Sequence, residues 1–244
     1  MNISKSAIVT GASRGIGAGI ALRLAKDGFA VAVNYAGNEA AAQKIVDTII
    51  AEGGKAFACQ ADVSKSHDVQ RLFEETELRF GGVDVLVNNA GKAIRKQLSD
   101  FTEAEFDEVV AINLKGAFLV LAEASRRLRD SGRIINISAS FQGAPIAGYG
   151  PYSATKLAIE KLTEVAAKEL GSKCITVNAI RPGPTRTDLF MNGKNEDLVK
   201  QFAAQAALGR IGEPKDIADV VAFLVSEQGG WVTGQAFGVN GGYW

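Results

Sequence analysis

The strongest constraint on the fold of this chain is an alternation of short apolar runs with longer helical patterns along all 244 residues. Amphipathic stretches such as 15–27 and 39–52 separate the apolar runs. Strands that alternate with helices predict parallel pairing, because a parallel crossover needs a helix between its two strands. Seven runs have the length and residue types of β-strands; they cover residues 7–10, 30–35, 56–60, 83–87, 133–137, 174–180 and 235–239.

The strand runs are apolar almost continuously, instead of at every second residue. Such runs are typical of strands buried on both faces, so we expect helices on both sides of the sheet. Right-handed crossovers then give a doubly wound, Rossmann-type α/β fold with a seven-stranded parallel sheet. Because no Pro/Ser-rich linker, low-complexity stretch or repeat marks a boundary, we predict one domain over residues 1–244.

The composition excludes several classes of function. The 27 basic and 27 acidic side chains give a formal net charge of zero, so no long-range field attracts nucleic acid. No apolar run approaches the ~18 residues of a membrane-spanning helix. His67 is the single histidine, and Cys59 and Cys174 are expected to pack in strands, so neither residue type builds a metal site. We predict no metal, no nucleic-acid partner and no membrane partner.

The first strand run begins within a few residues of Met1. This leaves no room for a signal or transit peptide, and we expect a cytoplasmic protein.

A glycine-rich turn joins the first strand run to the first helical stretch. Gly11 permits a tight turn, Gly15 lets the backbone approach a pyrophosphate, and Gly17 allows close packing of helix on strand. The helix N-terminus offers free N–H groups and a partial positive charge to an anion. The alternative is that the glycines serve the turn alone. We expect a dinucleotide to bind these glycines and the residues between them, namely Ser13, Arg14 and Ile16.

The spacing Thr-Gly-x-x-x-Gly-x-Gly over residues 10–17 resembles the fingerprint of the short-chain dehydrogenase/reductase family. The resemblance covers the entire chain. It implies transfer of a hydride between a nicotinamide cofactor and a carbonyl or secondary alcohol. Four further segments match the family in order and spacing; they are residues 88–91, 112–116, 152–156 and 181–185.

The end of the second strand run distinguishes the two nicotinamide cofactors. An acidic residue there would bind the ribose 2′-hydroxyl of NAD, but this run ends in Asn34 and Tyr35 without a carboxylate. Arg14 could reach the 2′-phosphate of NADP through charge-assisted hydrogen bonds. We therefore favour NADP(H), with Asn34 and Tyr35 beside it. NAD(H) remains the alternative, although the nearest acid, Glu39, is better placed to cap the next helix.

Tyr152 and Lys156 are four residues apart on a predicted helix, so both side chains lie on one face. Reduction of a ketone needs a proton donor, and the ordinary pKa of tyrosine, near 10, is too high for efficient proton exchange at neutral pH. A cation ~4 Å away at an effective dielectric of ~20 supplies the ~4 kcal/mol that lowers this pKa by about three units. We expect Tyr152 to act as the acid/base, with Lys156 lowering its pKa and binding the cofactor ribose.

The resemblance implies a serine that holds the substrate carbonyl at a set distance before the tyrosine. That position is Ala139 here, and Ser138 and Ser140 flank it. A longer following loop favours Ser138, which we prefer, and a deletion favours Ser140. The resemblance also implies that Asn113, on the apolar stripe of a helix predicted over 102–129, helps hold a water that bridges to Lys156. Alternatively, neighbouring helix carbonyls satisfy the Asn113 amide.

Further cofactor contacts follow from the resemblance alone. Gly91 would approach the nicotinamide ribose, and Asn89 would brace the central strands. Arg181 stands where the family often has a small residue, and no role is assigned to it. The remaining residues expected at the cofactor are Asp62 and Val63 at the adenine, Ala90, and Pro182, Gly183, Thr185 and Thr187 at the carboxamide; Asp62 is equally suited to cap a helix.

The substrate is expected to contact the segments that vary within the family, which are residues 92–96, the loop 141–151 and a lid over 187–211. Phe190, Met191 and Phe202 would give that lid an apolar lining. Within the family, the chain is similar to 3-oxoacyl-[acyl carrier protein] reductases, so a 3-oxoacyl thioester is one candidate substrate, beside a small or aromatic ketone. Four basic residues could form a patch for an acidic carrier protein; they are Arg126, Arg127, Arg129 and Lys173.

The resemblance implies a homotetramer built by the helices predicted over 102–129 and 152–171 and by the C-terminal strand, with Trp231 and Trp244 in packing or interface positions. Three alternatives to an NADP(H)-dependent carbonyl reductase stay open. They are an NAD(H)-dependent sugar or alcohol dehydrogenase, a dinucleotide-sensing protein without catalysis, and another Rossmann enzyme such as a methyltransferase.

Overall fold

A single parallel sheet organises the computed structural model, which describes residues 5–140 and 145–243. Its seven strands have the order β3-β2-β1-β4-β5-β6-β7, and every pair is parallel. The predicted doubly wound fold is confirmed, and each predicted strand run overlaps one strand, with ends that differ by up to two residues except at the start of β5. The strands are β1 (Ser6–Val9), β2 (Ala30–Tyr35), β3 (Lys55–Gln60), β4 (Val83–Asn88), β5 (Leu128–Ile137), β6 (Thr176–Pro182) and β7 (Ala236–Val239).

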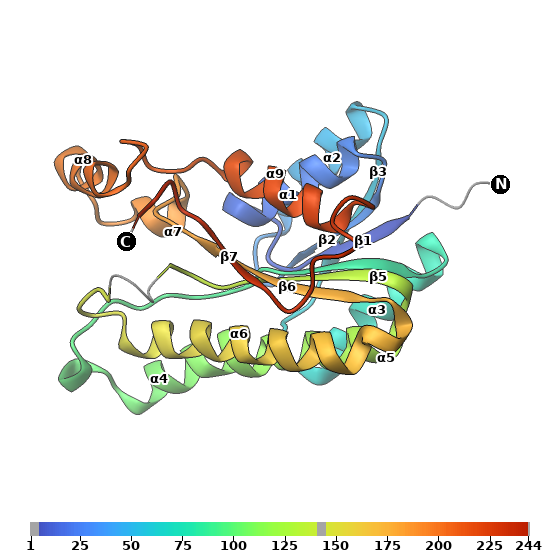
Figure 1. Ribbon diagram of the computed structural model, residues 1–244, viewed down its shortest axis with the longest axis horizontal. Helices are drawn as coiled ribbons and strands as arrows, with labels where there is room; N and C mark the ends of the chain where they lie inside the picture. The colour runs from blue at the N-terminus through green and yellow to red at the C-terminus, as the bar shows by residue number, and fades with distance from the viewer. Residues whose placement is uncertain (1–4, 141–144, 244) are drawn as a thin grey trace.

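Helices cover both faces of the sheet, as Figure 1 shows. One face carries α1 (Gly15–Lys26), α2 (Glu39–Ala51) and α9 (Pro214–Val225), with α1 packed along α9. The other carries α3 (Ser66–Phe80), α4 (Glu103–Val110), α5 (Ala117–Arg127) and α6 (Gly150–Leu170). Each face has its own apolar core, which explains why the strand runs are apolar at successive residues.

The helix predicted over 102–129 is not continuous. A π-helical turn, Ala111–Gly116, separates α4 from α5, and it contains the buried Asn113. The chain then enters β5 at Leu128, earlier than predicted, through an irregular register with Val83 of β4. A second correction concerns Cys174, which is exposed and has a left-handed backbone just before β6 instead of packing within it. Cys59 is buried in β3 as predicted.

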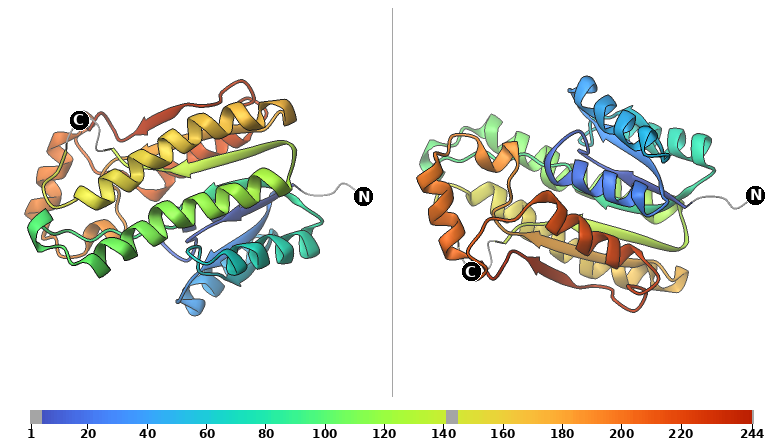
Figure 2. Two further views of the ribbon diagram at one scale, coloured as in Figure 1. Left: turned by 90° about the horizontal axis from the view of Figure 1, so that it is seen from below. Right: turned by 90° about the horizontal axis from the view of Figure 1, so that it is seen from above.

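The strand order reverses between β1 and β4, and parallel strands bring their carboxyl ends to one edge of the sheet. Ligands of open α/β sheets bind in the crevice outside this edge. Two short helices, α7 (Asp188–Met191) and α8 (Glu196–Gln205), lie beyond the same edge together with the C-terminal residues (Figures 1 and 2). Short 3-10 turns, Leu98–Asp100 and Gly171–Lys173, complete the connections.

Within the two described ranges, no helix combines the length and the hydropathy needed to cross a bilayer.

Candidate active site

A cleft of about 510 Å³ opens at the carboxyl edge of the sheet. It extends from the glycine turn, past the ends of β4, β5 and β6, to α7 and α8, so segments far apart in sequence meet in it. Many of the predicted site residues line this cleft; they are Gly11, Ser13, Arg14, Gly15, Ile16, Gly17, Tyr35, Asn89, Ala90, Gly91, Ser138, Ser140, Tyr152, Lys156, Pro182, Gly183, Thr185 and Thr187.

The glycine turn needs residues without a Cβ, because its backbone packs closely against the residues after β4 and against itself. Gly11 has φ +61°, and a Cβ on Gly17 would lie 2.5 Å from the Asn89 Nδ2 and from the Gly11 carbonyl oxygen. Helix α1 begins immediately after Arg14, which forms no side-chain cap, so the first N–H groups of the helix face the cleft. Free N–H groups at a helix N-terminus bind a pyrophosphate, and the residues present therefore fit a dinucleotide.

Asn89 holds the turn in place from the end of β4. Its Nδ2 donates to the carbonyl oxygens of Thr10 and Gly11 at 2.8 and 3.2 Å. Its own N–H and that of Ala90 donate to the Thr10 hydroxyl at 2.9 and 3.0 Å. These bonds fix β4 against the glycine turn at the point where the strand order reverses.

Asn34, which was predicted to contact the cofactor, does not line the cleft. Asn34 is 1% exposed, and its side chain points into the protein. The Oδ1 accepts the N–H of Gly11 at 3.2 Å, while the Nδ2 donates to the carbonyl oxygens of Cys59 and Ala61 at 3.2 and 3.0 Å. Asn34 therefore supports the glycine turn from behind.

Asp62 and Val63 also lie outside the residues that line the cleft. The Asp62 carboxylate accepts hydrogen bonds from the N–H and hydroxyl of Ser64, and these bonds lower its pKa against the effect of burial. Val63 is buried, and its Cγ2 lies 2.9 Å from a Cβ built on Gly116. The adenine contact predicted for this pair therefore gains no support from their side chains.

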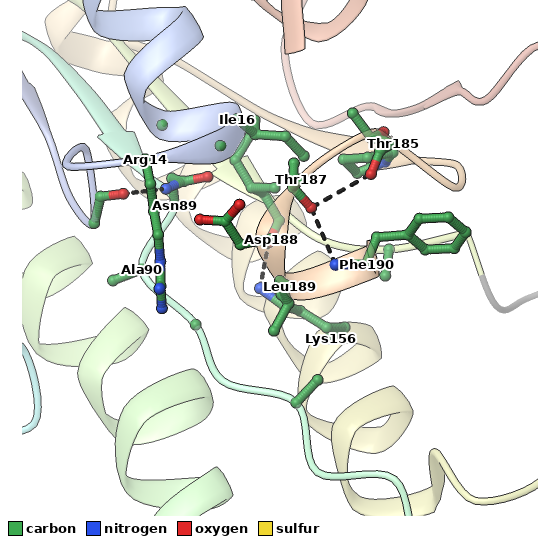
Figure 3. A pocket seen from close by; sticks show the side chains of 18 of the residues that line it. Arg14, Ile16, Asn89, Ala90, Lys156, Thr185, Thr187, Asp188, Leu189 and Phe190 are labelled. Carbon is green, nitrogen blue, oxygen red and sulfur yellow. Dashed lines mark hydrogen bonds between the residues drawn. The ribbon is translucent and has the colours of Figure 1, made fainter. Parts of the chain in front are cut away.

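Arg14 projects into the cleft near Tyr35 and residues 36–38, none of which is acidic. Among the described residues it forms no ion pair, and Figure 3 shows its guanidinium extended away from the glycine turn. Asn38, and not Glu39, caps α2, because the Asn38 Oδ1 accepts the N–H of Ala41 at 3.0 Å. A positive charge without a carboxylate at this end of β2 suits a ribose 2′-phosphate.

Tyr152 and Lys156 lie together in the first turns of α6, as their spacing predicted. The Lys156 Nζ is 5.8 Å from the centre of the Tyr152 ring and donates to the Ile137 carbonyl oxygen, at the end of β5, at 2.7 Å. Burial lowers the pKa of Lys156 from 10.5 to about 8 and raises the pKa of Tyr152 above its ordinary value of 10. The direction for Tyr152 is opposite to the expected lowering, because loss of solvent disfavours the phenolate.

The two candidate serines have different surroundings. Ser138 is 2% exposed, and its Oγ donates toward the Glu160 carboxylate at 2.7 Å and the Lys156 carbonyl oxygen at 3.0 Å. The Oγ of Ser140 donates to the carbonyl oxygen of Arg181 at 2.9 Å and accepts from the Nδ2 of Asn240 at 3.1 Å. Ser138 is thus bound to a carboxylate on α6, whereas Ser140 has only neutral partners among the residues described.

Asn113 is fully buried, and its amide has partners other than the helix carbonyls considered above. Its Nδ2 donates to the Lys92 carbonyl oxygen at 2.8 Å and to the Thr155 hydroxyl at 3.2 Å, and its Oδ1 accepts the Lys92 N–H at 2.8 Å. A Cβ built on Gly91 would lie 3.4 Å from this oxygen and 3.3 Å from the Lys156 Nζ. Asn113 therefore fixes the chain at 91–92 beside Lys156.

Helix α7 and the loop before it cover part of the cleft (Figure 3). Thr187 caps α7 by accepting the N–H of Phe190 at 3.2 Å, and the Thr185 hydroxyl donates to the Gly183 carbonyl oxygen at 2.8 Å. A Cβ built on Gly15 would lie 3.2 Å from the Thr187 Cγ2, so this segment contacts the glycine turn. Residues 141–144 of the predicted substrate loop, and Trp244, lie outside the described residues.

Aromatic rings form the wall of the cleft opposite the glycine turn. The ring centres of Phe190 and Phe202 are 5.2 Å apart, and those of Phe202 and Tyr243 are 6.4 Å apart. The Tyr149 ring lies 6.0 Å from that of Tyr152. Tyr149 belongs to the predicted substrate loop 141–151, although it was not named there, and Tyr243 was not predicted as a lining residue. The i, i+3 spacing of Tyr149 from Tyr152 could have indicated the first, but Tyr243 reaches the cleft only through the tertiary fold.

The four residues of the predicted basic patch have partners within the fold. Arg126 and Arg127 pair with Glu123, Arg127 also pairs with Glu77, and Arg129 pairs with Asp84, so carboxylates neutralise these charges. All lie where α5 enters β5, at the sheet edge opposite the cleft. Lys173 also points inward, since its Nζ donates to the carbonyl oxygen of Ser125. In the part of the chain that the structure describes, no group of three or more His, Cys, Asp or Glu residues could hold a metal ion.

The family model described as Enoyl-(Acyl carrier protein) reductase matches residues 11–244. The 3-oxoacyl-[acyl-carrier-protein] reductase FabG of Staphylococcus epidermidis is 45% identical over 242 residues, which cover 98% of this chain and 99% of that protein.

Two solved structures share the fold over nearly their whole length. A dehydrogenase/reductase from Sinorhizobium meliloti superimposes with a TM-score of 0.94 at 42% identity, over 98% of this chain and 94% of that one. A short chain dehydrogenase from Burkholderia cenocepacia, solved in complex with NADP, has a TM-score of 0.93 at 36% identity, over 100% and 99%.

Proposed function

Because the chain belongs to the short-chain dehydrogenase/reductase family of oxidoreductases, we propose that it reduces a carbonyl group to an alcohol with NADPH. The observation that carries the proposal is the pair of Tyr152 and the buried Lys156, which faces a cleft that the glycine turn and Arg14 also line. Membership of this family removes the methyltransferase alternative.

In this proposal the glycine turn and Arg14 would hold NADPH, which would supply a hydride for the carbonyl carbon. Tyr152 gives its phenolic proton to the carbonyl oxygen, which becomes the alcohol. Burial keeps the pKa of Tyr152 high, so the proton is present at neutral pH. The Lys156 ammonium group stabilises the phenolate that remains, until Tyr152 recovers a proton from solvent. Asn113 supports Lys156 by fixing the chain at residue 92.

We propose Ser140, instead of the Ser138 that the sequence favoured, as the serine that holds the substrate carbonyl. A serine has one proton to donate, and that of Ser138 is directed toward the Glu160 carboxylate at 2.7 Å. A charged acceptor binds a hydroxyl more strongly than the neutral carbonyl of a substrate does. The Ser140 proton has a neutral partner, the Arg181 carbonyl oxygen, and exchange for another neutral carbonyl costs little.

The first substrate to test is a 3-oxoacyl thioester, because the Staphylococcus epidermidis relative is named for that group. The aromatic wall of Phe190, Phe202 and Tyr243 favours a second candidate, an aryl ketone. A panel of both classes, measured with NADPH and NADH in parallel, distinguishes the two.

The test of the function compares the wild-type protein with Tyr152→Phe. General acid catalysis contributes about 10²- to 10⁴-fold, so we expect kcat to fall by at least about 100-fold while NADPH binding, followed by fluorescence titration, stays unchanged. Tyr149→Phe, one helical turn away in the same cleft, is the matched control and should retain most activity. A Tyr152→Phe protein that keeps its activity would disprove the proton-donor role. A wild-type protein that binds NADPH and reduces nothing in the panel would favour the dinucleotide sensor.

A further inference from the structure

A buried ion pair joins β6 to α6 next to the proposed reacting centre. Arg181 donates from Nε to the Glu160 Oε1 at 2.8 Å and from Nη2 to the Oε2 at 2.7 Å, so two parallel hydrogen bonds hold the carboxylate. Glu160 is 5% exposed, and the side chain of Arg181 is 19% exposed. Removing two charges from water carries a desolvation penalty that can exceed their attraction. Stability alone is therefore a weak reason for such a pair at this place.

The pair is connected to both serines and to Lys156. Glu160 follows Lys156 by one helical turn on α6. Its Oε1 accepts the hydroxyl of Ser138, which also approaches the Lys156 carbonyl oxygen at 3.0 Å. On the strand side, the carbonyl oxygen of Arg181 accepts the hydroxyl of Ser140 at 2.9 Å. One ion pair thus connects the helix of the proposed acid with the segment that carries both serines.

We propose that Arg181 and Glu160 are positioning residues that set the distance between Tyr152 and Ser140. The inference rests on the proposed function, in which these two side chains bind the same carbonyl oxygen. Neither charged residue touches the substrate. The two parallel hydrogen bonds restrain α6 relative to β6 in translation and in rotation, which a single bond does not achieve. A displacement of about 1 Å in a reacting geometry costs about 100-fold in rate, so a restraint of this kind affects kcat directly.

The two serines have different functions in this proposal. Ser138 belongs to the Glu160 network and acts through it, whereas Ser140 faces the substrate. Arg181, to which the sequence assigned no role, therefore acts at two points. Its side chain restrains α6 through Glu160, and its carbonyl oxygen accepts the hydroxyl of Ser140.

A double-mutant cycle tests the proposal. Arg181→Met or Glu160→Met alone leaves a buried charge without its partner, and we expect a large fall in Tm. The double variant removes both charges, and replacement of a buried pair by apolar side chains is often neutral for stability, so Tm should return close to the wild-type value. We expect kcat of the double variant to stay about tenfold or more below the wild type, with NADPH Kd unchanged.

The matched control is the double variant Arg127→Met with Glu77→Met. This pair has the same two-bond geometry, at 2.9 and 2.6 Å, but lies at the opposite edge of the sheet. Its removal should leave kcat at the wild-type level.

Two results would overturn the proposal. A double variant of Arg181 and Glu160 that recovers kcat together with Tm would show that the pair only stabilises the fold. Equal losses of kcat for Ser138→Ala and Ser140→Ala in the double-variant background would also contradict it, because Ser138 should have no further effect once Glu160 is gone. Failure of the proposed function gives a different signature, since Tyr152→Phe then keeps the wild-type rate whatever the cycle shows.

Discussion

Arg14 is the residue on which cofactor choice depends in the proposed function. Its guanidinium lies in the cleft beside Tyr35 and carries no ion pair with any described residue. A hydrogen bond to a charged partner is worth about 1.5–3 kcal/mol, which corresponds to about a 10- to 150-fold change in affinity. We therefore expect Arg14→Leu to raise the KM for NADPH at least tenfold and to leave the KM for NADH nearly unchanged.

Steady-state kinetics with both cofactors provide the measurement. Lys26→Leu, an exposed cation at the other end of α1, is the control and should alter neither KM. Equal losses for NADPH and NADH in Arg14→Leu would mean that the side chain supports the turn without contacting a 2′-phosphate.

Single residues show both the success and the limit of reasoning from the sequence. Tyr152 and Lys156 meet in the structure because helical spacing dictates it. The inward direction of Asn34 could not be predicted, since residues at the end of a strand buried on both faces have no polar side to indicate. The raised pKa of Tyr152 was missed for a related reason: the spacing gives the distance to Lys156, whereas desolvation depends on the whole surrounding fold.

At the scale of elements, α7 and α8 form the part of the cleft most suited to contact a substrate. Phe190 of α7 and Phe202 of α8 meet edge to face at 5.2 Å, and Phe202 continues to Tyr243 at 6.4 Å. Aromatic pairs contribute about 0.5–1.5 kcal/mol each beyond burial. Removing the shared ring should loosen both contacts, and we expect Phe202→Ala to raise the KM for the carbonyl substrate about tenfold.

If α7 and α8 form a lid over the substrate, Phe202→Ala should affect substrate binding and not cofactor binding. NADPH Kd should stay unchanged in Phe202→Ala, because the glycine turn lies at the other end of the cleft. Leu78→Ala, an exposed side chain on α3 far from the cleft, serves as the control. A parallel loss of NADPH binding in Phe202→Ala would show that α8 supports the whole cleft instead of closing over a substrate.

The elements themselves were largely predictable. Continuous apolar runs located all seven strands, because these runs have the length of strands and are too short for buried helices. The interruption of the helix over 102–129 was not predictable, since the π-helical turn contains no proline, and its one glycine, Gly116, stands at its last position and does not mark where it begins. That turn buries Asn113 beside Lys92. The same turn therefore explains why the helix is not continuous and why the Asn113 amide binds Lys92 instead of neighbouring helix carbonyls.

Across the whole molecule, the two ends of the parallel strands differ in how their charged side chains are paired. The edge where α5 enters β5 carries ion pairs such as Arg127 with Glu77 and Arg129 with Asp84, so its charges are satisfied within the fold. The carboxyl edge instead holds the buried Lys156, and Arg14 there has no partner among the described side chains. These ion pairs were not predicted, because the sequence shows where cations occur and not which carboxylates face them.

A buried lysine imposes a cost on the stability of the entire fold, and this cost depends on pH. The folded-state pKa of Lys156, about 8, lies below its ordinary value of 10.5 because burial disfavours the ammonium group. Between these two values the unfolded chain binds more protons than the folded one, so the contribution of Lys156 to stability rises with pH. Below pH 8 the penalty is fully present, and a shift of this size corresponds to about 3 kcal/mol at about 1.4 kcal/mol per pKa unit.

Replacement of this cation should therefore separate stability from activity. We expect Lys156→Met to abolish most carbonyl reduction and yet to gain stability relative to the wild type at pH 7, with the gain shrinking by about 3 kcal/mol as the pH rises to about 10.5. Urea denaturation of both proteins across this range gives the difference directly, because groups common to both cancel. Lys161→Met, an exposed lysine on the same helix that pairs with Glu164, should run parallel to the wild type. If Lys156→Met also runs parallel, Lys156 is not buried as an ammonium group, and its proposed part in stabilising the Tyr152 phenolate is lost with it.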